Sequence, residues 1–470
     1  MDTIHGAPLG SPRNGVHFRV SNLTCHWLDT GILRLYAHRV PIRRAGAAIK
    51  TSIQPTGGAG LFHRRNFMLT VAAGSLSARQ AKSDTFGKRP ITGSTDPPIR
   101  DFDAQPLAVK TQPDVVIFEG NYPAWPWVTR DRHGRLYCTL REDGIKDRKD
   151  TGHGFSPLGK TLVTHSDDAG QTWSVPTVVS DIKGIDETGG GLTVLPDESL
   201  MISFYSRFGP SGAPSQAWTS RSTDRGQTWS RATPTSDQDT RARSAVIAMS
   251  NGEILAPIYR SMFSKEGHQG IAAISSDHGA TWKNYLVPNA PSGELNEWSV
   301  LEVEPGRIIG LHRDEDQEDR GWFWKTESND WGRTWAEPVR TNVRSAKSSS
   351  PPQLDFHGDR VVLTYADARM VSVAMVSTTD PDYERWDVDD RVRCYQYRSD
   401  GRQIADASYP CSVAVGPHRR LIVDYEIESL ITPDASQVID YELKRERKQI
   451  TGHFVDTPKI WGAAEVCIRS

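Results

Sequence analysis

The sequence predicts an all-β fold, a six-bladed β-propeller of four-stranded antiparallel blades. Three observations support this prediction. A frame with the pattern Ser-x-Asp-x-Gly-x-Thr-Trp recurs, a second phrase made of a turn and an apolar strand recurs with it, and no long segment keeps the 3.6-residue apolar period of a helix. A period of about 50 residues is typical of solenoids, propellers and arrays, because one unit cannot bury its own apolar face and must stack on its neighbours.

The Asp-containing frame marks the repeats. Its copies are SDDAGQTW from Ser166, STDRGQTW from Ser222, SSDHGATW from Ser275, SNDWGRTW from Ser328 and a worn copy, STTDPDYERW, from Ser377. The aspartates fall at 168, 224, 277, 330 and 380, so they are 50 to 56 residues apart. In this frame the Asp can accept backbone N–H bonds within its own turn, the Gly permits a positive φ, and the Trp packs between sheets. We interpret the frame as a hairpin clamp on the face of the propeller away from the ligand.

The second phrase occurs six times and often ends in arginine. Its copies are RDRHGRLYCTLRE (130–142), LPDESLMISFYSR (195–207), MSNGEILAPIYR (249–260), EPGRIIGLHRD (304–314), FHGDRVVLTYADAR (356–369) and GPHRRLIVDYE (416–426). Short β-rich runs between Gly, Asp and Asn turns predict hairpins. Six units of about 53 residues would fill about 320 residues, which matches the span from about 115 to 445.

A different kind of sequence precedes the repeats. Arg64 and Arg65 stand before a modest apolar run, Phe67 to Leu76, in a pattern that resembles a twin-arginine export signal and is too short to cross a bilayer. A basic disordered arm is the alternative. We therefore expect a non-structural N-terminal extension at 1–60, a signal segment at 61–83, a linker at 84–112, the propeller at 113–445 and a C-terminal tail at 446–470. The signal predicts a periplasmic or secreted protein.

Charge and cysteine content argue against several classes of function. The chain has 56 Lys and Arg against 58 Asp and Glu, so its net charge of −2 gives no reason to expect nucleic acid or a membrane surface as partner. The five cysteines include no Cys-x-x-Cys pair and are odd in number, which supports neither a zinc site nor a disulfide framework. No metal motif is present, and we expect a monomer whose chemistry needs neither a metal nor a cofactor; a structural calcium, which propellers can carry, stays open.

The ends of the second phrase are the candidate functional positions. The innermost strands of a propeller converge on its axis, so residues at the ends of these phrases are expected to share one pocket. The six phrase ends are Arg141, Arg207, Arg260, Arg313, Arg369 and Glu426. A ring of arginines is typical either of ion pairs between blades or of a carboxylate site, because Arg binds a carboxylate through a bidentate fork.

With four near-complete Asp boxes, residues 112 to 445 resemble the sialidase (neuraminidase) superfamily of six-bladed propellers. The resemblance implies a glycoside hydrolase of the exo-α-sialidase type that cleaves a terminal acidic sugar from a glycan or glycoconjugate. Such enzymes bind the substrate carboxylate with three arginines, use a tyrosine nucleophile activated by a glutamate, and use a loop aspartate as acid/base. A neutral phenol avoids the charge repulsion that a carboxylate nucleophile would meet at such a sugar.

The resemblance assigns roles to individual residues. NEWSVLEVEPGRIIGLHR matches the family's Glu followed by an arginine, which implies Glu297 as the activating base and Arg313 as a carboxylate ligand. ADAR before the worn Asp box implies Arg369 as another ligand. DASYPCSVAVGPHRRLIVDYE resembles the family's Tyr-Ser phrase and the strand after it, which implies Tyr409 as nucleophile and Glu426 as supporting acid.

The first carboxylate-binding arginine of the family has no counterpart here. It belongs in GNYPAWPWV, residues 120–128, where Asn121 or Ala124 takes its place, depending on register. Trp125 in the same stretch is a candidate substrate contact. Arg141 is a candidate replacement, because TLRED ends the first of the phrase strands.

The acid/base residue belongs in the loop before the first Asp box. The loop REDGIKDRKDTGHGFSPLGK offers Asp143, Asp147, Asp150 and His153. We favour Asp150 or His153, because a histidine can donate a leaving-group proton near neutral pH as well as an Asp of raised pKa.

Two other functions fit the same residues. A propeller lyase could remove a proton next to a uronate carboxylate, with Tyr409 or His153 as base. A glycan-binding propeller without catalysis would be consistent with the missing arginine; Tyr409 would then be a wall residue and Glu297 an ion-pair partner of Arg313.

Overall fold

The protein is described by a computed structural model for residues 17–20, 23–27, 33–37, 110–144, 155–210, 213–237, 239–260, 267–315, 321–345, 350–397, 402–430 and 448–464. The chain divides into two compact units, Met1–Asp96 and Pro97–Ser470. In the first unit, β1 (His17–Val20), β2 (Leu23–Trp27) and β3 (Leu33–Ala37) form an antiparallel sheet. These strands lie where we expected a non-structural extension; runs such as LRLYA alternate apolar and polar residues, which suits strand pairing. The signal segment 61–83 lies outside the described residues and stays a prediction.

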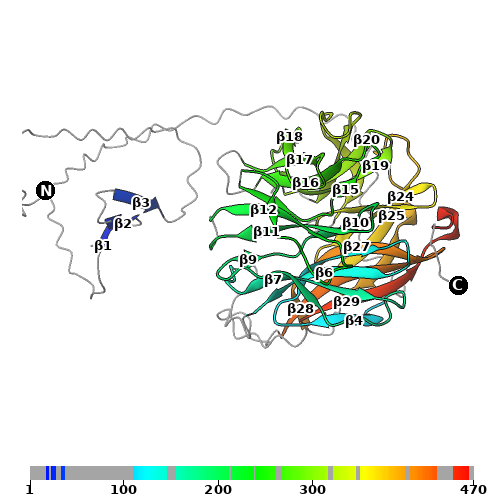
Figure 1. Cartoon of the computed structure of the whole chain (residues 1–470), viewed down its shortest axis with the longest axis horizontal. Helices are drawn as coiled ribbons and strands as arrows, with labels where there is room; N and C mark the ends of the chain where they lie inside the picture. Colours follow the sequence, from blue (N-terminus) through cyan, green and yellow to red (C-terminus); the bar gives the residue numbers. More distant parts are fainter. Residues whose placement is uncertain are drawn as a thin grey trace, which may run out of the picture. The chain divides into compact units, whose positions relative to one another are not determined.

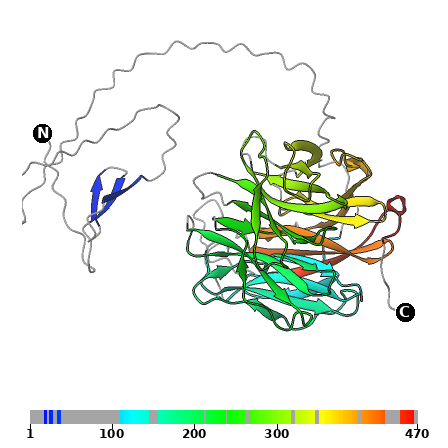
Figure 2. The ribbon, with the colours of Figure 1, turned by 45° about the horizontal axis from the view of Figure 1, so that its top comes forward.

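The second unit is an all-β propeller of six antiparallel blades, which confirms the predicted fold (Figures 1 and 2). The first blade contains β5 (Ala124–Arg130), β6 (Leu136–Asp143), β7 (Gly159–Ser166) and β8 (Thr177–Ser180). The second contains β10 (Gly191–Val194), β11 (Leu200–Arg207), β12 (Ser215–Ser222) and β13 (Thr233–Pro234), with β9 (Asp186–Glu187) also on β11. The third contains β14 (Thr240–Ala242), β16 (Ile254–Arg260), β17 (Gln269–Ser275) and β18 (Lys283–Leu286), with β15 (Ile247–Ala248) also on β16.

The other three blades follow the same order. The fourth contains β19 (Leu295–Glu304), β20 (Arg307–Asp314), β21 (Trp322–Ser328) and β22 (Val339–Arg344). The fifth contains β23 (Gln353–His357), β24 (Arg360–Ala368), β25 (Ser372–Thr378) and β26 (Val392–Gln396). The sixth contains β27 (Arg402–Gly416), β28 (Arg419–Leu430), β29 (Lys448–Asp456) and β4 (Val115–Glu119).

Helices are nearly absent from the described part of this unit. They are two 3-10 turns, η1 (Val388–Asp390) and η2 (Lys459–Trp461). Among the described residues, no helix has the length and hydropathy that a bilayer crossing needs.

The sixth blade closes the ring with strands from both ends of the repeat region. β29 pairs with β28 on one side and with β4 on the other, and Figure 1 shows β29 and β4 side by side. The predicted end of the propeller at 445 was therefore wrong. The segment KQITGHFVD contains neither the Asp frame nor the strand phrase, so no repeat signal marks it, yet it supplies the third strand of the sixth blade.

Each of the four near-complete Asp frames is a self-contained clamp, as predicted. In the first frame, the Asp168 carboxylate accepts hydrogen bonds from the backbone N–H of Thr172 at 2.9 Å and from its hydroxyl at 2.5 Å. The Ser166 hydroxyl accepts from the N–H of Gly170 at 2.8 Å, and Gly170 has a φ of 94°. The indole of Trp173 donates to the Gly170 carbonyl at 3.0 Å. These contacts fix the turn between β7 and β8.

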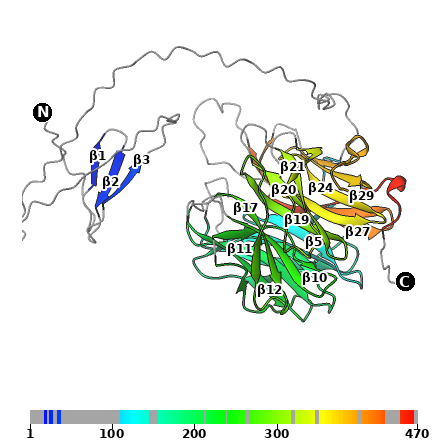
Figure 3. The same cartoon turned by 90° about the horizontal axis from the view of Figure 1, so that it is seen from above.

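The strands of the second phrase are second in their blades, so the expectation that they are innermost was wrong. Each phrase begins with the turn that joins the first and second strands, and it therefore forms the outer arm of that hairpin. The first strands lie innermost: β5 lies beside β10 of the second blade and β27 of the sixth, towards the middle of the propeller in Figure 3. The apolar core lies between blades, as where Leu136 and Cys138 of the first blade pack with Val423 and Tyr425 of the sixth.

Candidate active site

Irregularities in the innermost strands carry three of the candidate residues. The register shifts around Trp125 between β5 and β6, around Glu297 between β19 and β20, and around Tyr409 between β27 and β28. Each shift inserts one extra residue into the innermost strand, which makes it a β-bulge. A bulge breaks the regular alternation of side chains and can re-aim one of them.

Two of these bulges contain strained backbone. Trp125 has a φ of 55°, Ser408 of 86° and Tyr409 of 68°. A left-handed conformation at a non-glycine residue costs about 1–3 kcal/mol and persists only where the surroundings hold it. Pro126 and Pro410 follow the two aromatic residues directly, and proline within a sheet is confined to edges and bulges because it has no N–H.

Tyr409 and Glu297 form the central pair of the site. The hydroxyl oxygen of Tyr409 lies 3.1 Å from Oε2 and 3.2 Å from Oε1 of Glu297, so the phenol donates its proton to the carboxylate. Both residues are buried. The structure therefore brings together the two residues to which the resemblance assigned the roles of nucleophile and base, although 112 residues separate them.

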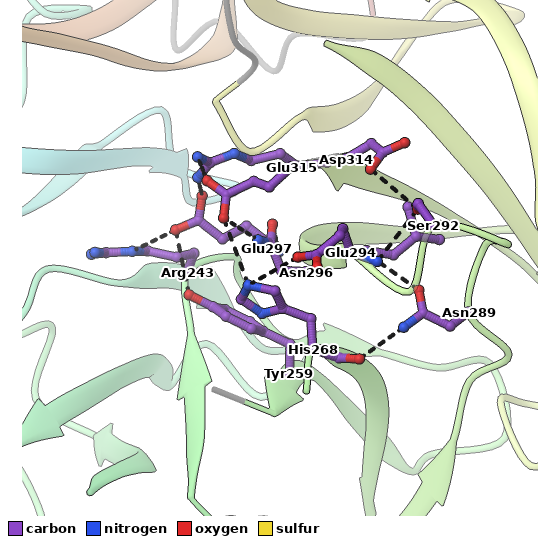
Figure 4. Close-up of polar contacts among 12 residues, drawn as sticks. Arg243, Tyr259, His268, Asn289, Ser292, Glu294, Asn296, Glu297, Asp314 and Glu315 are labelled. Carbon is purple, nitrogen blue, oxygen red and sulfur yellow. Dashed lines mark hydrogen bonds and ion pairs between the residues drawn. The ribbon is translucent and has the colours of Figure 1, made fainter. Parts of the chain in front are cut away.

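Three arginines surround this pair. Arg313 contacts the Glu297 carboxylate and donates from Nη1 to the Tyr409 hydroxyl at 3.2 Å. Arg369 places its guanidinium 5.5 Å from the centre of the Tyr409 ring. Arg243 donates from Nε to Oε1 of Glu297 at 3.2 Å. We call Tyr409, Glu297, Arg243, Arg313 and Arg369 the tyrosine–glutamate cluster; Figure 4 shows its Arg243–Glu297 contact.

The electrostatics of the cluster keep the carboxylate ionised and the phenol neutral. Burial alone would raise the pKa of Glu297, but Arg313 and Arg243 outweigh it and hold that pKa at about 2. Burial and the Glu297 charge raise the pKa of Tyr409 to about 12, against the opposing effect of the arginines. At neutral pH, Glu297 is therefore ready to accept a proton that Tyr409 still carries.

Arg243 is the member of the cluster that the sequence prediction missed. It does not end a strand phrase; it lies where the innermost strand of the third blade is interrupted, between β14 and β15. Its guanidinium lies 4.0 Å from the centre of the Trp125 ring and 5.5 Å from that of Tyr409. Its Nη1 is buried and has no partner among the described residues. The tight spacing of Arg241 and Arg243 before an apolar strand is the signal that could have indicated it.

Two further tyrosines contact the same cluster, and their pKa values are shifted in opposite directions. The Tyr259 hydroxyl lies 3.4 Å from Oε1 of Glu297, and burial followed by that charge raises the pKa of Tyr259. The Tyr205 hydroxyl instead accepts a hydrogen bond from Nη2 of Arg243 at 2.9 Å. Burial opposes ionisation of Tyr205, but the neighbouring arginines, Arg243 first among them, lower its pKa.

Arg141, the candidate replacement for the missing arginine, is fully buried beside the cluster. Its Nη2 and Nε lie 2.8 and 3.2 Å from Oδ1 of Asp186, while Nη1 has no partner among the described residues. Its guanidinium lies 5.5 Å from the Trp125 ring, on whose π system Arg243 also packs. The side chain of Asn121 donates to the Asp143 carbonyl at 3.0 Å. A ligand role for Arg141 stays a prediction.

Glu426 lies in a different set of contacts. Its carboxylate accepts hydrogen bonds from the Tyr395 hydroxyl, at 3.1 Å, and from the Gln449 amide. These partners lie on β26 of the neighbouring blade and on β29 of its own blade. Its predicted role as supporting acid stays a prediction.

The predicted acid/base candidates Asp150 and His153, and Asp147 with them, lie outside the described residues. Asp143 is described and buried, and its carboxylate accepts from the Ser156 hydroxyl at 2.6 Å and lies 3.6 Å from Arg141. Within the described ranges, no group of three or more His, Cys, Asp or Glu side chains is arranged to hold a metal ion.

Comparisons with known proteins agree with the fold. The family model for the BNR repeat-like domain matches residues 157–412, more than half of the chain. A protein of unknown function from Dyadobacter fermentans is similar in structure, with a TM-score of 0.58 and 20% identity over 74% of this chain and 99% of that one.

Two sialidase structures are also similar. A leech intramolecular trans-sialidase, complexed with 2,7-anhydro-Neu5Ac, has a TM-score of 0.51 and 13% identity over 74% of this chain and 70% of that one. NanB, a sialidase from Streptococcus pneumoniae, has in its complex with Optactamide a TM-score of 0.50 and 13% identity over 73% and 70% of the two chains. At these identities the likeness shows the fold alone. No curated protein matches the sequence.

Proposed function

The chain belongs to the BNR repeat-like domain family, and from that premise we propose that it is a retaining glycoside hydrolase of the exo-α-sialidase type that acts on a terminal acidic sugar. One observation carries the proposal. A buried, protonated Tyr409 donates its hydrogen bond to an ionised Glu297 at 3.1 Å, which is the arrangement that a tyrosine nucleophile with a carboxylate base requires.

The pair suits a double displacement. In the first half, Oη of Tyr409 bonds to the anomeric carbon, its proton passes to Glu297, and the leaving-group oxygen departs with a proton from an acid, for which Asp150 and His153 are the candidates. In the second half, water attacks the anomeric carbon and gives its proton to the same acid/base residue. The Tyr409 oxygen leaves as Glu297 returns the proton. Two displacements retain the anomeric configuration.

Arginines supply the affinity for an acidic sugar. Arg313 and Arg369 correspond to two arms of the carboxylate clamp, and we propose that Arg243 replaces the arm missing from GNYPAWPWV. Arg243 suits this role because it is buried against Trp125 and Tyr409 and its Nη1 has no partner among the described residues. A charge-assisted hydrogen bond contributes about 1.5–3 kcal/mol. The contact of Arg243 with the ligand carboxylate should therefore strengthen binding of the acidic sugar substantially.

Hydrolysis of fluorogenic glycosides tests the proposal. A sialic acid glycoside and a panel of uronic acid glycosides are offered to the wild type, to Tyr409→Phe and to the control Tyr285→Phe, whose phenol lies on the outer strand β18. We expect release of the fluorophore that falls at least about a hundredfold in Tyr409→Phe and is kept in the control. Arg243→Met should raise KM far more than it lowers kcat.

Other outcomes point to the alternatives. Products that absorb in the ultraviolet without uptake of water would indicate a lyase. If no form hydrolyses the substrates and Tyr409→Phe still binds the sugar, the protein would be a glycan-binding propeller. The missing arginine favours this alternative. We also propose export through the twin-arginine segment; mature chains that begin near Met1 would contradict it.

A further inference from the structure

Arg313 has both of its terminal nitrogens engaged by carboxylates of the protein. Nη1 contacts Glu297 and Nη2 contacts Glu315, while Nε is buried with no partner among the described residues. Glu297 belongs to the catalytic pair, but Glu315 has no part in the proposed chemistry. A ligand carboxylate that binds Nη2 of Arg313 would therefore have to displace the Glu315 carboxylate.

Glu315 is more exposed than the arginine that it contacts. It follows β20 directly, and its side chain is 29% exposed, whereas that of Arg313 is 6% exposed. Its Oε2 accepts a hydrogen bond from the Asn296 side chain at 2.8 Å and lies 3.7 Å from Nε2 of His268 (Figure 4). The Glu315 carboxylate thus lies between Arg313 and His268, with Oε1 on Arg313 and Oε2 on Asn296 and near His268.

His268 is placed to receive that carboxylate. It is buried, its ring lies 6.4 Å from that of Tyr259, and its Nδ1 has no partner among the described residues. Among the described residues, the charges that face it are Glu315, Glu294 at 3.9 Å, and the more distant Arg313 and Arg241. Burial lowers the pKa of His268 and Glu315 opposes this effect, so the imidazole is neutral at neutral pH while Glu315 remains on Arg313.

We propose that Glu315 is a specificity-determining residue, an internal carboxylate that occupies Arg313 and must be displaced by the carboxylate of an acidic sugar. The displaced Glu315 turns to His268, which then takes up a proton. This inference rests on the proposed function, because it assumes that Arg313 binds the ligand carboxylate. Two consequences follow. Sugars without an acidic group gain nothing by displacing Glu315, and acidic sugars bind more tightly as the pH falls and His268 becomes easier to protonate.

Calorimetry on the full chain tests the inference without turnover. The probes are N-acetylneuraminic acid, glucuronic acid and the methyl ester of each, measured in buffers of different ionisation enthalpy. The wild type should take up a proton when it binds an acid and none when it binds an ester. Glu315→Gln should bind the acids about tenfold more tightly, because a neutral amide competes less well for Arg313, and should lose the proton uptake.

Two further variants separate this role from a structural one. Glu304→Gln, at the other end of the same hairpin, removes an exposed carboxylate 3.9 Å from Arg307 and should leave affinity and proton uptake as in the wild type. His268→Gln should still bind the acids but lose the dependence on pH.

Unchanged or weaker acid binding by a folded Glu315→Gln overturns the inference, and so does the absence of acid binding by every form. The proposed function fails separately: tighter acid binding by Glu315→Gln with no hydrolysis by the wild type would support the role of Glu315 and refute catalysis.

Discussion

Replacing Glu297 by Gln removes the negative charge that Arg313 and Arg243 surround. The resulting loss in the free energy of unfolding can be worked out from the structure. Arg313 and Arg243 outweigh burial and hold the pKa of Glu297 at about 2, against an ordinary 4.5. Each pH unit between the two values corresponds to about 1.4 kcal/mol, so the ionised carboxylate contributes about 3 kcal/mol to the free energy of unfolding. Because the pKa is lower in the folded chain, this contribution is complete above about pH 4.5 and is lost as the pH falls towards 2.

Urea unfolding followed by tryptophan fluorescence measures this contribution. At pH 7, Glu297→Gln should be about 3 kcal/mol less stable than the wild type, and the difference should shrink by about 1.4 kcal/mol for each pH unit below about 4.5. Glu304→Gln is the control, since its carboxylate is 66% exposed and its removal should change stability by less than about 0.5 kcal/mol. A difference that stays constant from about pH 7 to pH 3.5, or that is below about 1 kcal/mol at pH 7, would refute the reasoning.

Two other predictions concern groups outside the Tyr409–Glu297 pair. Despite the burial of Tyr205, neighbouring arginines lower its pKa below the ordinary value of 10. A difference titration near 295 nm should therefore show that Tyr205→Phe has lost one phenol that ionises below that value. A titration curve identical to that of the wild type would contradict this. Hydrogen bonds, chiefly from Thr281, lower the pKa of Asp277 in the third Asp frame to about 2. Asp277→Asn should therefore have a lower thermal unfolding midpoint than the wild type at neutral pH, and this difference should fade as the pH approaches 2. Equal midpoints at pH 7 would show that the clamp adds no stability.

The repeats predicted the fold because each signal is local. The contacts of an Asp frame, such as those from Ser166 to Thr172, close within one turn, so the sequence of that turn determines them. The end of the propeller could not be predicted in this way. β29 is defined by pairing with β4, which lies at the opposite end of the repeat region, and such a contact leaves no local pattern.

The site was only partly predictable for a similar reason. Tyr409 and Glu297 were found through motifs, but their meeting depends on two β-bulges in different blades. The prolines in AWPW and SYPC do indicate bulges, because a central strand excludes proline. Arg243 lies in an interruption of its strand, and its partner Glu297 is 54 residues away, so the spacing of Arg241 and Arg243 before an apolar strand could indicate the arginine but not its partner.

The pairing of β4 with β29 also decides when the molecule can be completed. β4 leaves the ribosome first among the propeller strands, and β29, which begins at Lys448, follows roughly 330 residues later. At about 10 residues per second, β4 therefore waits on the order of half a minute for its partner. Until then β4 is a strand without a partner, and the β29 of a second copy could pair with it instead. A low concentration of nascent chains should favour closed rings. Closely spaced ribosomes on one messenger RNA should instead favour dimers in which two chains exchange their β4 strands.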